Sequence, residues 1–235
     1  MKLKINSISL IPIFKSLSEL TNEARLQFNE TGLKIIELCP ANVSLTEVVL
    51  NKEMFIQYEL SKNEVFGIDV MNFLKIIKDL KKSDITITNT ETSLILEYNG
   101  FKSEIPLIEI ETEQKTIPNL EFNTEIKINS KTLKEILKTL CSLSESVKIE
   151  KIGDKVIFSS DKTQSVLYND MEVLIKGENC LSRYSSEYLT KFIKNQISEN
   201  VILRLGTDMP LSFEYEVKNF FSIKYILAPR VEYED

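Results

Sequence analysis

The fold is decided by residues 64–100, EVFGIDVMNFLKIIKDLKKSDITITNTETSLILEYNG. Within this stretch Val70, Phe73 and Ile77 recur at helical spacing, and two strand-like runs then flank the polar turn NTET. The same order returns in residues 183–217, RYSSEYLTKFIKNQISENVILRLGTDMPLSFEYEV, as a helix, a polar break and a hairpin. The match predicts a tandem duplication of one α+β unit.

Helical periodicity marks four segments of the chain. They lie at about residues 9–20, 69–82, 130–141 and 185–196. We expect Asp69 to cap the second helix and Pro12 to lie in the first turn of the first helix. Either Ser130 or Asn129 caps the third. The rest of the chain is rich in short β-branched runs, with hairpin turns at 29–32, 89–92, 152–155 and 206–209.

This order predicts the fold class α+β, with antiparallel sheets in two duplicated units. We expect an N-terminal domain at 1–110, an interdomain connector at 111–124 and a C-terminal domain at 125–235. The connector begins ETEQKTIPNLEFN, which is polar, contains a proline and has no strong periodicity.

The composition excludes several classes of enzyme and of membrane protein. There is no histidine, which removes Ser-His triads and most zinc sites, and the six glycines form no phosphate-binding motif. No apolar run approaches the ~20 residues that span a bilayer, and the N-terminus lacks a signal-peptide pattern. The three cysteines, Cys39, Cys141 and Cys180, suit small core positions in a reducing compartment. We expect no catalytic residue, no metal and no cofactor.

Charge is distributed unevenly over a chain of net charge −6. The four helical segments hold ten lysines and five acidic residues. These lysines lie away from the apolar stripe of their helices, as they also would on a merely solvated face. Three helices that each carry lysines opposite their apolar stripe, in an acidic protein, favour a basic surface. Such a surface contacts the phosphates of duplex DNA without recognising the base sequence. The candidate DNA-binding residues are Lys15, Lys75, Lys78, Lys131, Lys134, Lys138, Lys191 and Lys194.

Six segments, in order along almost the whole chain, resemble the sliding clamps of the proliferating cell nuclear antigen (PCNA) family. They are LTNEARLQFNETGL (20–33), ANVSLTEVVL (41–50), FGIDVMNFLKIIK (66–78), EQKTIPNLEF (113–122), MPLSFEYEV (209–217) and KYILAPRVE (224–232). The lysine- and isoleucine-rich composition looks more like an archaeal clamp than a eukaryotic one.

The resemblance implies a ring of three subunits, with sheets outside and helices lining a hole for double-stranded DNA. It implies no catalysis: a clamp loader opens the ring, and DNA polymerase, ligase and nuclease partners bind through short PIP-type peptides. The subunits would form a homotrimer, or a heterotrimer with paralogues, without any membrane. The expected location is cytoplasmic and nucleoid-associated in an archaeon, or nuclear in a eukaryote.

The resemblance also assigns a pocket for the partner peptide, beside the connector and the C-terminal segment, which the peptide joins as an added strand. Its residues are Leu38, Asn42, Val43, Leu45, Ile117, Pro118, Pro210, Tyr225, Ile226, Ala228, Pro229, Arg230 and Val231. Ordinary core packing is the alternative for Leu38, Leu45 and Ile226. The connector residues Ile117 and Pro118 are harder to explain as core.

The chain departs from the family pattern in two places. Its first helix has Ile11, Pro12 and Ser18 where relatives carry lysines, which leaves Lys15 alone. Lys115 occupies a connector position where relatives usually place an apolar residue, so part of the pocket wall is changed. Among the other lysines, Lys75, Lys78, Lys138 and Lys194 match basic family positions, whereas Lys131, Lys134 and Lys191 rest on their helical face alone.

Subunits of such a ring should meet edge to edge, through FKSEIPLIEI (101–110) and SVLYNDMEVLI (165–175), unless these are ordinary sheet members. Three alternatives stay open. The chain could be a specialised subunit of a heterotrimeric or checkpoint-type clamp, or a protein-interaction scaffold without DNA contact. A carboxylate-dependent hydrolase would need two acidic residues converging in a cleft.

Overall fold

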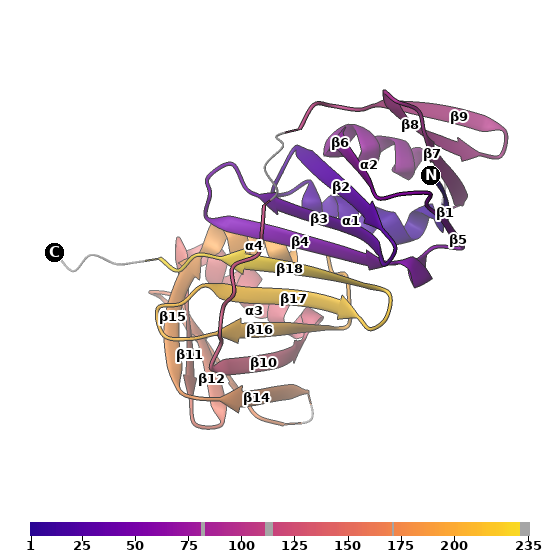
Figure 1. Cartoon of the computed structure of the whole chain (residues 1–235). Coiled ribbons are helices and arrows are strands. Elements are labelled where there is room, and N and C mark those ends of the chain that lie inside the picture. Colours follow the sequence, from indigo (N-terminus) through magenta and orange to yellow (C-terminus); the bar gives the residue numbers. More distant parts are fainter. Residues whose placement is uncertain (81–82, 111–114, 171, 231–235) are drawn as a thin grey trace. The chain divides into compact units, whose positions relative to one another are not determined.

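The computed structural model describes residues 1–80, 83–110, 115–170 and 172–230 (Figure 1). Contacts divide the chain into two compact units. The first comprises Met1–Pro40, Thr46–Ile117 and Val217–Ile223, and the second comprises Ala41–Leu45, Pro118–Glu216 and Lys224–Asp235. The cut between Ile117 and Pro118 falls inside the predicted connector, and the domain boundaries at 110 and 125 remain a prediction.

The first unit begins with a strand and a helix and continues with short strands around a second helix. Its elements are β1 (Lys2–Asn6), α1 (Ser7–Leu17), β2 (Glu23–Asn29), β3 (Gly32–Leu38), β4 (Ser44–Asn51), the 3-10 helix η1 (Lys52–Met54), β5 (Gln57–Glu59), β6 (Glu64–Asp69), α2 (Val70–Asp79), β7 (Asp84–Asn89), β8 (Ser93–Tyr98) and β9 (Phe101–Pro106). The strands form two sheets, in the orders β5-β1-β7-β8-β9 and β4-β3-β2-β6. Neighbours such as β1 and β7 run antiparallel.

The second unit has the same arrangement. Its elements are β10 (Thr124–Asn129), α3 (Ser130–Leu143), β11 (Ser146–Ile152), β12 (Lys155–Ser159), β13 (Gln164–Tyr168), β14 (Val173–Gly177), β15 (Cys180–Ser185), α4 (Ser186–Lys194), β16 (Asn200–Leu205), β17 (Leu211–Val217) and β18 (Phe221–Leu227). Its sheets have the orders β14-β10-β16-β17-β18 and β13-β12-β11-β15.

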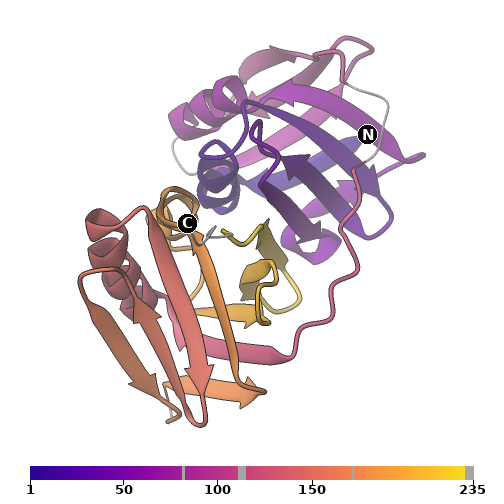
Figure 2. The same cartoon turned by 90° about the vertical axis from the view of Figure 1, so that its left-hand side faces the viewer.

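The two units match strand for strand. Each runs strand, helix, five strands, helix, three strands, and each sheet order of one unit maps onto that of the other. In both units the two helices pack against each other, α1 on α2 and α3 on α4, as Figure 2 shows from the side. The predicted duplication of an α+β unit is therefore confirmed.

Helix caps agree with the sequence analysis at α2 and differ at α1. The Asp69 side chain accepts a hydrogen bond of 2.7 Å from the Asn72 amide, as expected of a cap. The prediction for Pro12 is wrong: Asn6 caps α1 by accepting from the Ile8 amide, so the helix starts at Ser7. Pro12 therefore lies inside α1, beyond its first turn.

The third helix resolves the choice between two candidate caps. Asn129 accepts from the amides of Lys131 and Thr132, and Ser130 is the first helical residue. An asparagine one residue before the helix can reach these amides, whereas Ser130 is buried under the helix start. None of the described helices is long and apolar enough to cross a membrane.

Aromatic side chains join the two helices of the first unit to each other and α4 of the second unit to its sheet. In the first unit Phe14 of α1 meets Phe73 of α2, with ring centroids 4.4 Å apart. In the second unit Phe192 of α4 stacks on Tyr225 of β18 at 4.3 Å, and Phe213 of β17 packs beside them. Burying one apolar face of each helix leaves the opposite face to water, which is the face that carries the lysines.

The four predicted hairpin turns join β2 to β3, β7 to β8, β11 to β12 and β16 to β17, as expected. The segment 165–175, a candidate for the subunit contact, is not one strand. Its first part belongs to β13 and its last part to β14, which are edge strands of different sheets. A turn separates them, in which the Asp170 carboxylate accepts from the Glu172 and Val173 amides.

Candidate DNA and partner interfaces

The lysine surface of the first unit is small. Lys15 on α1 and Lys75 and Lys78 on α2 are exposed, on helices whose opposite faces are buried. Exposed apolar side chains accompany them, with Ile8 at 47% and Met71 at 54% exposure. Within the described residues, this helix pair carries three candidate lysines, against five on the pair in the second unit.

The second unit holds five candidate lysines on two packed helices. Lys131 and Lys138 on α3 and Lys194 on α4 are exposed. Lys134 is half-buried because its ammonium donates 3.0 Å to the carbonyl of Lys194, the last residue of α4. Such a contact satisfies a carbonyl at the helix end and joins α3 to α4.

Lys191 is held by its own helix. Its ammonium lies 2.7 Å from Glu187 and 4.8 Å from the centre of the Tyr188 ring. A pair at i and i+4 is worth only about 0.3–0.5 kcal/mol, so it orients the lysine without fixing it strongly. Lys191 is accordingly a weaker candidate for a phosphate contact than its exposed neighbours.

Several predicted pocket residues belong to the second unit. The Ala228 amide donates 2.9 Å to the Val43 carbonyl, which ties the start of the C-terminal segment to the loop before β4. Val43 is 38% exposed, and Asn42 beside it adopts a positive φ of 59°. Pro229 and Pro210 are half-buried and Pro118 is exposed.

Two of these candidates lie in the core. Tyr225 is fully buried and stacked on Phe192, and Ile226 is 8% exposed. Core packing therefore accounts for both positions, the alternative that the sequence analysis kept for Ile226. Leu45 is half-buried.

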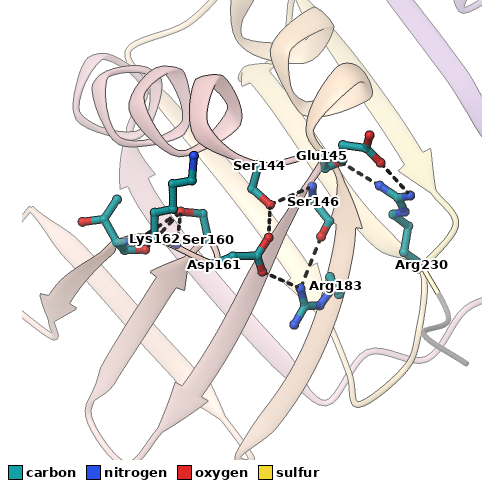
Figure 3. A network of polar contacts seen from close by, with 9 residues as sticks. Ser144, Glu145, Ser146, Ser160, Asp161, Lys162, Arg183 and Arg230 are labelled. Carbon is teal, nitrogen blue, oxygen red and sulfur yellow. Dashed lines mark hydrogen bonds and ion pairs between the residues drawn. The ribbon is translucent and has the colours of Figure 1, made fainter. Parts of the chain in front are cut away.

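A polar network anchors the C-terminal segment to the second unit (Figure 3). The Arg230 amide donates 2.7 Å to the Arg183 carbonyl of β15, and the Arg230 guanidinium donates 2.9 Å to the Glu145 carbonyl. The Arg183 guanidinium in turn lies 3.4 Å from Asp161. Together with the Ala228–Val43 hydrogen bond, these contacts hold residues 228–230 on the second unit, while Val231 lies outside the described residues.

The sequence analysis missed Glu145, Asp161 and Arg183, because no local motif connects residues so far apart. Ser144 donates 2.7 Å to the Asp161 carboxylate. This hydrogen bond is the main reason that the pKa of Asp161 is lowered, with smaller contributions from Arg183 and Lys162.

The remaining pocket candidates belong to the first unit. Leu38 at the end of β3 and Ile117 in the connector are both half-buried. Lys115, the predicted departure from the family, forms an ion pair of 2.9 Å with Glu37. The first part of the connector, 111–114, lies outside the described residues.

Comparison with known proteins assigns the family. The model of the PCNA N-terminal domain matches residues 1–104, and that of the PCNA C-terminal domain matches residues 116–230. The chain belongs to the PCNA family. The predicted resemblance is thereby confirmed over nearly the whole chain.

Individual relatives agree with this assignment. The DNA polymerase sliding clamp of Thermococcus onnurineus (strain NA1) is 28% identical over 236 residues, 94% of either chain. PCNA of A. fulgidus, solved with the C-terminal region of FEN-1, superposes with a TM-score of 0.90 at 24% identity, over 99% of both chains. A chain of the PCNA2–PCNA3 complex of Sulfolobus tokodaii superposes with a TM-score of 0.86 at 23% sequence identity, over 99% of this chain and 100% of that one. At these identities the two structures show a shared PCNA fold.

The edge strands of this PCNA-family chain suit pairing with another chain. β9 ends the five-stranded sheet of the first unit and β13 ends the four-stranded sheet of the second. Phe101 on β9 is 71% exposed and Tyr168 on β13 is 64% exposed. Unpaired backbone groups beside exposed aromatic side chains are typical of strands that pair between subunits.

Metal chemistry finds no support in the part of the chain that the structure describes, which contains no group of three or more potential metal ligands. The cysteines follow the expectation of scattered small residues. Cys39 and Cys180 are buried and Cys141 is half-buried, all three as free thiols.

Proposed function

We propose that this chain is a DNA sliding clamp, which encircles duplex DNA as a trimeric ring and tethers DNA polymerase, ligase and nuclease partners. The observation that carries the proposal is the duplicated unit whose helix pairs expose lysines in a protein of net charge −6. The clamp has no chemistry of its own and needs no cofactor. A clamp loader opens and closes the ring. The clamp acts on DNA, in the cytoplasm of an archaeon or in the nucleus of a eukaryote.

The DNA contact rests on Lys75, Lys78, Lys138 and Lys194, with Lys15, Lys131, Lys134 and Lys191 in support. Ammonium groups on helix surfaces meet phosphates as point charges, without bidentate recognition of any base. Binding of this kind holds the duplex without stopping it from sliding. The weaker basic surface of α1 and α2 reduces the contribution of the first unit.

Partner binding rests on the anchored segment Ala228–Arg230, the connector residues Ile117 and Pro118, and the loop at Asn42 and Val43. A segment whose backbone is already held in place loses little entropy when a peptide pairs with it. The FEN-1 region in the A. fulgidus structure is the model for such a peptide. Leu38, Leu45, Pro210, Pro229 and Val231 complete the proposed site, and Tyr225 and Ile226 support it from the core.

The ring closes through β9 of one subunit and β13 of the next, in a head-to-tail contact that a threefold rotation repeats. The partner across this contact is either the same chain or a paralogue. The heteromeric alternative gains support from the lysine-poor α1 and from the S. tokodaii PCNA2–PCNA3 complex.

A topological experiment tests encirclement directly. The chain is loaded by a clamp loader and ATP onto nicked circular DNA, and retention is measured on a sizing column. We expect retention on the circle and loss after a single restriction cut, because a ring slides off a free end. Equal retention on circular and linear DNA, or none on either, would contradict the proposal.

A further inference from the structure

Glu37 joins two parts of the first unit with one carboxylate. Its side chain is only 9% exposed, at the C-terminal end of β3. One carboxylate oxygen accepts 2.7 Å from the Arg25 amide of β2. The other lies 2.9 Å from the ammonium of Lys115, in the connector. The side chain therefore bridges a rigid sheet and the segment that leads to Ile117.

We propose that Glu37 is a positioning residue for partner binding: its ion pair with Lys115 holds the connector so that Ile117 and Pro118 meet the partner peptide. The inference rests on the proposed function, which places those two residues in the partner site. It also gives Lys115 a role as the anchor that stands in place of an apolar contact.

Packing explains why this anchor matters. A cavity of about 250 Å³ adjoins the ion pair, and its lining combines charged side chains such as Arg25 and Glu109 with the apolar residues Ala24, Ile36 and Ile110. Because this space is not filled by side chains, close packing there contributes little to holding Lys115. A buried carboxylate, in contrast, is costly without its partners, and this cost favours conformations in which Lys115 stays in place. Because Lys115 is 38% exposed, the effect is smaller than for a fully buried pair.

The same unit contains a matched control. Lys34 on β3 pairs with Glu47 on β4 at the same distance of 2.9 Å. The side-chain exposures are also alike. The two lysines are 39% (Lys34) and 38% (Lys115) exposed, and their glutamates are 11% and 9% exposed. The two pairs differ in that Lys34 lies within a sheet, whereas Lys115 lies in the connector. Lys34→Met and Lys115→Met therefore remove equivalent charges from equivalent pairs.

Hydrogen–deuterium exchange on the full-length protein tests the anchor without any partner. We expect the amides of residues 115–117, 119 and 120 to exchange about tenfold faster in Lys115→Met, and at the wild-type rate in Lys34→Met. Glu37→Gln keeps an acceptor for the Arg25 amide and loses the ion pair, so it should accelerate the same amides. Unchanged exchange in both Lys115→Met and Glu37→Gln would overturn the inference.

Peptide affinity tests the consequence for binding, with a fluorescein-labelled peptide of the FEN-1 C-terminal region as the probe. We expect the dissociation constant to rise about three- to tenfold in Lys115→Met and in Glu37→Gln, and to stay unchanged in Lys34→Met. The double variant Lys115→Met/Glu37→Gln should bind like either single variant, because both remove one interaction. Additive losses would contradict the inference. If the wild type does not bind the peptide, the proposed partner site fails while the exchange experiment still decides whether Glu37 holds the connector.

Discussion

Asp161 is an exposed side chain that organises the surface around the C-terminal segment. Its carboxylate accepts from Ser144 and pairs with Arg183, whose backbone carbonyl accepts from the Arg230 amide. The hydrogen bond from Ser144 contributes most to the lowered pKa of Asp161. A carboxyl group with a lowered folded pKa stabilises the fold above its unfolded pKa, and this contribution is lost as the pH falls through the folded value.

Ser144→Ala should therefore raise the pKa of Asp161 towards its ordinary value of 3.8. The carboxyl carbon resonance of Asp161, followed by NMR against pH, measures the shift. Ser160→Ala is the matched control, since the Ser160 hydroxyl contacts Thr163 and the Lys162 amide and not the Asp161 carboxylate. An unshifted pKa in Ser144→Ala would show that Ser144 is not the main cause.

At this scale the sequence is informative about local contacts only. The Asp69 cap was predictable, because Asp69 is only three residues from Asn72, whose amide donates the hydrogen bond to it. The pair Lys115–Glu37 spans 78 residues and the bond from Arg230 to Glu145 spans 85. Such pairs depend on the sheet register, which no short motif encodes. The structure gives Lys115 an ionic partner, Glu37, that its local sequence does not indicate.

At the scale of elements, α1 shows how a cap can override a proline signal. Proline is favoured in the first turn, which is why Pro12 suggested a later start. Asn6 instead begins the helix at Ser7, so the ring of Pro12 replaces an amide that would donate to the Ile8 carbonyl. The four apolar stripes were predictable because burial of one helix face imposes the 3.6-residue period.

Pro12→Ala should stabilise the protein. An interior proline costs a helix about 3 kcal/mol relative to alanine, and the looser unfolded chain of the variant offsets about 1 kcal/mol. We expect the free energy of unfolding to rise by about 1–2 kcal/mol in urea titrations at one protomer concentration. Pro40→Ala in the loop after β3 is the control. It should lower the free energy of unfolding slightly, because the unfolded chain gains conformational entropy when proline is replaced. If the free energy of unfolding fell in both variants, Pro12 would fit α1 without strain.

The helix faces carry the DNA prediction. Replacing Lys75, Lys78, Lys138 and Lys194 by alanine should shorten retention on circular DNA, and should flatten the dependence of log affinity on log salt by about 0.9 for each phosphate that is no longer neutralised. The control replaces four exposed lysines outside the helices, Lys62, Lys127, Lys176 and Lys218, which removes the same charge. Equal loss in both variants would mean that net charge, rather than the helix faces, governs binding.

At the scale of the whole molecule, duplication gives one chain two equivalent sets of sheets with differently charged helix pairs. The duplication was predictable because both copies repeat the order of helix and hairpin. The division of 165–175 between two strands was not predictable. Two successive strands of different sheets show the same alternation of apolar and polar residues as one longer strand. Sequence periodicity identifies strands, and only pairing assigns them to a sheet edge.

The ring prediction belongs to this scale. We expect light scattering to give about three times the 27.1 kDa protomer for the purified chain, if identical subunits pair β9 with β13. Phe101→Asp places a charge at the exposed edge of β9 and should dissociate the trimer, because an unpaired charge in an interface core is costly. Ile56→Asp, at another exposed apolar side chain of the same unit, should leave the mass unchanged. A wild-type monomer or dimer would instead favour a heteromeric ring, and a trimer that survives Phe101→Asp would exclude the centre of the contact from β9.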